Sequence, residues 1–218
     1  LALTGLLAVG AGSLPTLVNA HSAKVMNVAM KPAMAPTSMS AASDLRLVLN
    51  RLLAEHVVLA TSATNAAIGG RDGEFKAAAG ALDANSVELS KAIASVYGKP
   101  AGDAFLPLWR KHIGFFVDYT VGLATKDQTK ANTARAAIIG YADDFAAFLN
   151  SASPDLPVDA VAKLVRVHGK TLRTVIELQV KGDQAGAYKQ LRVAIAHMQN
   201  IADPLSETIV KQFSAKFM

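Results

Sequence analysis

Apolar residues recur every three or four positions through most of the chain after residue 44, which is the spacing of one face of an α-helix. The first such stripe consists of Leu45, Leu49, Leu52, His56, Leu59 and Ala63. No stretch alternates between apolar and polar residues with the period of two that is typical of a strand. The pattern therefore predicts an all-α fold.

Short breaks rich in glycine, proline or polar residues divide this pattern into six helices. The breaks lie at residues 69–73, 98–100, 126–127, 153–157 and 182–183. Helices of roughly 22–28 residues joined by short turns are typical of up-and-down bundles. We therefore predict that residues 44–218 form three antiparallel helical hairpins, packed as one bundle or as two sub-bundles.

The predicted hairpins contain an internal repeat. Two sets of polar residues recur with a period of 56: His56, His112 and His168 on the odd helices, and Asn85, Tyr141 and His197 on the even helices. At about 1.5 Å per helical residue, each lies roughly 21–23 Å from the turn of its hairpin. We expect three copies of a unit of about 56 residues, each with two polar side chains on its apolar stripes at one height.

This layer is the candidate functional site. Neutral imidazole is the commonest metal ligand in proteins and suits zinc and copper. The predicted metal ligands are His56, His112, His168 and His197. Two opposed histidines could instead bind a b-type haem, which needs no cysteine. The residues expected to line the cofactor site are Trp109, Phe116, Tyr141 and Met198.

A structural interpretation of the same layer stays open. Buried polar groups need hydrogen-bond partners, and a shared layer allows them to satisfy one another without a metal. Duplication of one hairpin would then have copied a buried histidine that had only a structural role.

Several common enzyme motifs are missing from the sequence. It contains no HExxH, GxSxG, GxxxxGK[ST] or GxGxxG motif, and Glu-x-x-His pairs of a di-iron bundle are missing as well. We therefore predict a protein that is not an enzyme. The chain also has no Cys, which excludes disulfides, thiolate metal sites and iron–sulfur clusters.

Residues 1–20 resemble the apolar core and cleavage site of a secretory signal peptide, ending in Val18-Asn19-Ala20. Gly10, Gly12 and Pro15 interrupt the apolar run, which makes it a poor membrane span. We therefore expect an exported protein, either secreted or at the cell surface. The alternative is a retained arm that docks on a neighbouring subunit and forms a homo-oligomer or polymer.

Residues 21–43 are rich in Met, Ala and Pro and are predicted to be a linker or part of that arm. Thioethers favour Cu(I), and cleavage after Ala20 would create an amino-terminal histidine, which chelates Cu(II). The weaker, secondary metal ligands predicted here are His21, Met26, Met30 and Met34. A linker without metal is the simpler interpretation.

The charge of the chain argues against a nucleic-acid partner. The formal net charge is +5, from 22 basic and 17 acidic residues, and the charges are scattered without a basic run that contains aromatic residues.

Two passages, Leu108–Thr120 and Ala194–Phe217, resemble secreted helical-repeat proteins of Gram-positive bacteria, some of which lie near copper-amine-oxidase-type N-terminal domains. The resemblance covers about residues 45–217 and implies export and helical repeats. Together with the histidine layer, it predicts an exported, non-catalytic protein that binds a metal ion or haem. The rival prediction is a filament or surface-layer-like assembly protein whose histidines form only a polar core.

Overall fold

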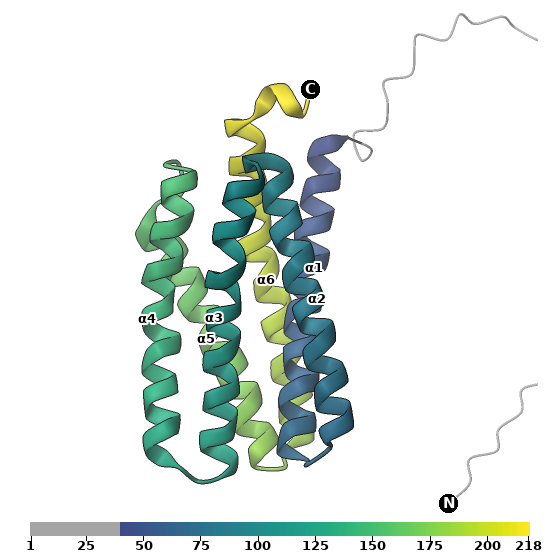
Figure 1. Ribbon diagram of the computed structural model, residues 1–218, viewed down its shortest axis with the longest axis vertical. Coiled ribbons are helices and arrows are strands. Elements are labelled where there is room, and N and C mark those ends of the chain that lie inside the picture. Colours follow the sequence, from purple (N-terminus) through teal and green to yellow (C-terminus); the bar gives the residue numbers. More distant parts are fainter. Residues whose placement is uncertain (1–39) are drawn as a thin grey trace, which may run out of the picture. The chain divides into compact units, whose positions relative to one another are not determined.

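The computed structural model describes residues 40–218, which form six α-helices and no strand (Figure 1). These helices are α1 (Ala41–Ile68), α2 (Asp72–Tyr97), α3 (Lys99–Ala124), α4 (Gln128–Ala152), α5 (Val158–Val180) and α6 (Gln184–Gln212), followed by the short 3-10 helix η1 (Ser214–Lys216). The predicted all-α fold of three antiparallel hairpins is confirmed. Helix α1 begins three residues before the predicted boundary because Ser40 and Ser43 form a reciprocal capping box.

The three hairpin turns are built alike. Each contains one residue with a positive φ angle, namely Gly70 (65°), Lys126 (59°) and Gly182 (75°). The even helices begin two residues later, at Asp72, Gln128 and Gln184. Both sets of positions therefore follow the period of 56 that separates His56 from His112.

The helices of residues 40–218 form one compact bundle rather than two sub-bundles. Consecutive helices are neighbours, and α6 closes the ring against α1. Helices α1, α3 and α5 also contact one another, so they are the inner helices, and α2, α4 and α6 occupy the outer positions. The three hairpin turns lie at one end of the bundle, and the α2–α3 and α4–α5 connections lie at the other (Figure 1).

Burial of apolar side chains between the helices holds the bundle together. Ion pairs such as Arg46–Asp203, between α1 and α6, and Arg110–Asp83, between α3 and α2, cross neighbouring helices at the surface. Because they are exposed, each such pair contributes at most about 1 kcal/mol. Within residues 40–218, none of the helices combines the length and apolar character needed to span a membrane.

A candidate metal centre in the bundle core

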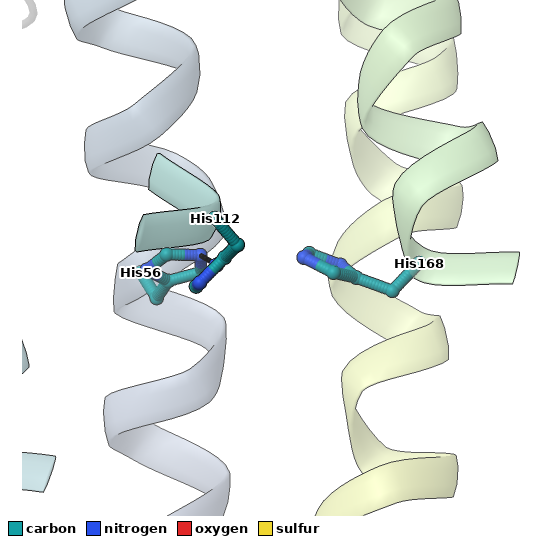
Figure 2. Close-up of side chains that lie close together, drawn as sticks. All are labelled: His56, His112 and His168. Carbon is teal, nitrogen blue, oxygen red and sulfur yellow. Dashed lines mark hydrogen bonds between the residues drawn. The ribbon is translucent and has the colours of Figure 1, made fainter. Parts of the chain in front are cut away.

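Three histidines from the three inner helices meet in the middle of the bundle. His56 lies on α1, His112 on α3 and His168 on α5, and their exposed fractions are 1%, 3% and 6%. Each occupies the apolar stripe of its helix at the same height, so the rings point toward one another. Figure 2 shows His56 and His112 side by side, with His168 pointing toward them from α5. We call these residues the histidine triad.

The spacing of the triad suits a metal ion. One ring nitrogen from each histidine lies within 4.8 Å of the others. The Nε2 atoms of His56 and His112 are 3.4 Å apart. Tetrahedral zinc with Zn–N bonds of about 2.0–2.1 Å places two imidazole nitrogens about 3.3–3.4 Å apart. The Nε2 atoms of His56 and His112 are therefore already as far apart as two ligands of one zinc ion. A small movement of the His168 ring toward them would complete the set of three ligands.

Hydrogen bonds within the described chain do not satisfy the triad. Both ring nitrogens of His168 lack a hydrogen-bond partner there, and so does Nδ1 of His56. The 3.4 Å contact between His56 and His112 is longer than a normal hydrogen bond. Buried polar atoms without partners are rare in folded proteins and call for an explanation. A metal ion would bind one nitrogen of each ring.

Burial keeps the triad in its metal-binding form. Loss of hydration lowers the pKa of His56 well below its ordinary value, and the neighbouring histidines lower it further. Burial lowers the pKa of His112 to about 3 and that of His168 to about 4. All three rings are therefore neutral at pH 7, and a neutral imidazole has the free lone pair that a metal requires.

The fourth predicted ligand, His197, is not part of this cluster within residues 40–218. It lies on the outer helix α6, and its Nε2 donates to the carbonyl oxygen of Leu164 on α5 at 2.9 Å. In the first hairpin, Asn85 Nδ2 donates in the same way to the carbonyl oxygen of Leu52 at 3.0 Å. His197 and Asn85 thus each join the two helices of their hairpin, because their side chains reach the adjacent inner helix before the axis.

From the sequence we predicted His197 as a fourth ligand and did not separate the residues of the inner helices from those of the outer helices. The sequence nevertheless contains a signal for this difference. The acceptor carbonyls belong to Leu52 and Leu164, which lie four residues before His56 and His168. Leu108 lies at the same position before His112. A residue with an obvious acceptor on its own hairpin is a weaker candidate for a metal ligand. Tyr141 occupies the equivalent position in the second hairpin, and its hydroxyl has no partner in the described part of the chain.

The predicted wall residues surround the triad. The rings of Trp109 and Tyr141 lie 4.5 Å and 5.0 Å from that of His112, the first edge-on and the second stacked. A cavity of about 50 Å³ adjoins His112 and His168. Its lining includes the four predicted wall residues, Trp109, Phe116, Tyr141 and Met198.

The size of this cavity limits what can bind there. A water molecule needs roughly 10–15 Å³ of such space, so about 50 Å³ accepts a small fourth ligand beside a metal ion. Pockets for drug-sized molecules start at about 300 Å³. The space beside His112 and His168 in this packing of the helices is therefore smaller than such a pocket.

The secondary metal site predicted in the N-terminal segment lies outside the described residues. His21, Met26, Met30 and Met34 belong to this segment, as do residues 1–20 with their signal-like sequence. The secondary site and the retained arm therefore stay predictions.

No family model, curated protein or solved structure matches the chain. The interpretation of the site therefore depends on its own chemistry, and the resemblance to secreted helical-repeat proteins stays a prediction.

Proposed function

We propose that this protein is an exported, non-catalytic metal-binding protein that holds one zinc or copper ion in the core of its bundle. His56, His112 and His168 are the ligands. The observation that supports this most directly is the convergence of three neutral imidazoles, one from each hairpin, within 4.8 Å in a buried site. Three histidines with an open fourth position form a donor set that zinc accepts.

The choice between zinc and copper depends on charge. The charged groups that shift the pKa values of the triad are other histidines rather than carboxylates. An ion bound to three neutral rings keeps its full charge in a medium where charge is costly. A monovalent copper ion, or a zinc ion with hydroxide as its fourth ligand, reduces that cost. Both ions therefore belong in the binding test.

The test is metal stoichiometry after equilibrium dialysis of purified protein against Zn²⁺, or against Cu⁺ under reducing conditions. We expect about one ion per chain and no Soret absorption band. His56→Ala, His112→Ala and His168→Ala should each lose the ion. His197→Asn is the matched control, because it removes a histidine that lies outside the triad but keeps a donor group.

The proposal fails if the wild-type protein binds no ion, or if the three triad variants retain it. Metal-free protein that polymerises through residues 1–43 would support the assembly role instead. A loss of metal in His197→Asn as well would return His197 to the ligand set.

Export rests on the signal-like sequence of residues 1–20 and on the resemblance to secreted proteins. Expression of the chain behind an initiator methionine in a Gram-positive host tests it. We expect the protein in the medium or at the cell surface, with a mature amino terminus near His21 by mass spectrometry. Intact protein retained inside the cells would contradict the proposal without affecting the metal site.

A further inference from the structure

A second pocket lies on the opposite side of the histidine triad from the small cavity. On α1 and α3, most residues that line the small cavity precede the triad histidines, among them Leu53 and Phe105, and Phe116 borders both spaces. The second pocket is lined by residues that follow them, such as Ala60 on α1 and Thr120 on α3. Its volume is about 320 Å³. The pocket therefore occupies the half of the bundle nearer the hairpin turns.

This pocket connects the protein surface with the triad. Its outer lining includes the exposed residues Ala67, Asp72 and Val121. Its deepest lining includes His56 and Leu172, whose exposed fractions are 1% and 0%. A molecule that enters between α1, α2 and α3 can therefore reach the ring of a triad histidine.

The volume of the pocket results from small side chains on α1. Ala60 and Ala63 are buried and line it, and Ala67 lies one turn further along the same face. The facing walls are larger apolar side chains, among them Phe75 on α2 and Phe116 on α3. The pocket is therefore a gap between complete helices, left open where α1 carries alanine.

The polar groups of the pocket are already engaged within the protein. Thr64 donates its hydroxyl hydrogen to Gln179 Oε1 at 2.8 Å, and Thr120 donates to the carbonyl oxygen of Phe116 at 2.8 Å. Asp72 lies only at the exposed rim. At the deep end, His56 Nδ1 has no partner among the described residues. A molecule inside would therefore meet apolar walls and one imidazole.

We propose that this pocket binds a small, uncharged, largely apolar molecule about as large as a substituted benzene, with one end against His56. An apolar cavity of about 150 Å³ is already large enough to bind benzene, and 320 Å³ accepts a larger ring system. A charged molecule would lose its hydration without gaining a partner, so it is excluded. This site does not depend on a bound metal. In the metal-loaded protein, on the proposed function, the occupant would lie beside a ligand of the ion.

The test uses the metal-free full-length chain, with toluene and indole as probes and benzoate as the charged comparison. Methyl NMR signals of Ala60, Ala63 and Leu172 report on the pocket, and those of Leu49 and Leu53 report on the small cavity. We expect toluene and indole to shift the first group in a saturable way and to leave the second unchanged. Benzoate should shift neither group.

Ala63→Phe fills the pocket from within and should weaken binding of toluene by at least about tenfold. Ala67→Trp covers the outer end from an exposed position, where a large side chain is compatible with folding, and should also weaken binding. Ala77→Trp is the matched control, because Ala77 is exposed on α2 and does not line the pocket. It should bind toluene as the wild-type protein does.

The proposal is overturned if neither apolar probe binds, if both pocket variants bind toluene as tightly as the wild type, or if the shifts appear at the small cavity. Because the titrations use metal-free protein, failure of metal binding leaves these outcomes unchanged. Conversely, a protein that binds zinc but not toluene or indole disproves the pocket proposal alone.

Discussion

His168 and His197 show how one residue type serves two purposes within a single hairpin. Both are buried, and the charge of His197 contributes to the lowered pKa of His168. Nε2 of His197 donates a hydrogen bond to a backbone carbonyl, whereas both ring nitrogens of His168 lack a partner in the described chain. In the metal-free protein, His168 therefore destabilises the fold, whereas His197 stabilises it.

Substitution by leucine separates the two roles. In metal-free protein, His168→Leu should raise the free energy of unfolding by about 1–3 kcal/mol, because it removes an unsatisfied buried polar group. His197→Leu should lower it by about 1–2 kcal/mol, because the carbonyl of Leu164 loses its side-chain donor. Urea unfolding with a chelator present measures both. A destabilised His168→Leu would mean that His168 has a hydrogen-bond partner in the metal-free fold.

At the scale of the elements, the three hairpin turns repeat one backbone conformation with different residues. Two of them place glycine in the left-handed region, and the second places Lys126 there. A residue with a Cβ atom in this region is strained by about 1–2 kcal/mol, whereas glycine is not. The middle hairpin therefore carries strain that the other two avoid.

Lys126→Gly should remove this strain and raise the free energy of unfolding by about 1 kcal/mol. Lys91→Gly is a suitable comparison, since Lys91 is exposed in the interior of α2. There the same substitution should lower the free energy of unfolding by about 1 kcal/mol, which is the cost of glycine in a helix. Chemical denaturation of both variants checks the pair. Equal effects in the two variants would contradict the conformation assigned to the turn.

For the molecule as a whole, the position of the triad means that a bound ion would join all three hairpins. Each ligand comes from a different inner helix. Any ligand that binds only the folded state adds to its stability by mass action. Metal binding at the triad, as proposed, would therefore be coupled to folding of the whole bundle.

Zinc at about one hundred times its dissociation constant should stabilise the fold by about 2.7 kcal/mol, which raises Tm by about 5–10 °C for a chain of this size. Differential scanning calorimetry with and without zinc measures the shift. His112→Ala should show no shift, whereas His197→Asn should shift like the wild type. An equal shift in His112→Ala would place the bound zinc elsewhere on the chain.

The lowered pKa values also predict how stability depends on pH in the metal-free protein. Unfolded histidines bind protons below about pH 6.5, whereas His112 and His168 in the folded chain do so only near their pKa values of about 3 and about 4. Stability therefore falls as the pH decreases from about 6.5 toward 4, by up to about 1.4 kcal/mol per pH unit for each histidine.

Urea midpoints measured between pH 7.5 and pH 5 with a chelator present should show this decline. The slope of His168→Leu should be smaller by the contribution of one proton. If the wild type and His168→Leu have the same slope, His168 is protonated in the folded state and the ring is not buried as described.

The sequence by itself determined the helices, the turns between them and the height of each polar residue, because period and spacing along a helix are local properties of the chain. The period of 56 alone is enough to place His56, His112 and His168 at one level. Only the tertiary structure decided which helices surround the axis. That arrangement separates the triad from His197, because a side chain on an outer helix reaches the inner helix of its own hairpin before it reaches the axis of the bundle. The pocket beside His56 likewise depends on how three helices pack around short alanine side chains, a distance between helices that no local pattern encodes.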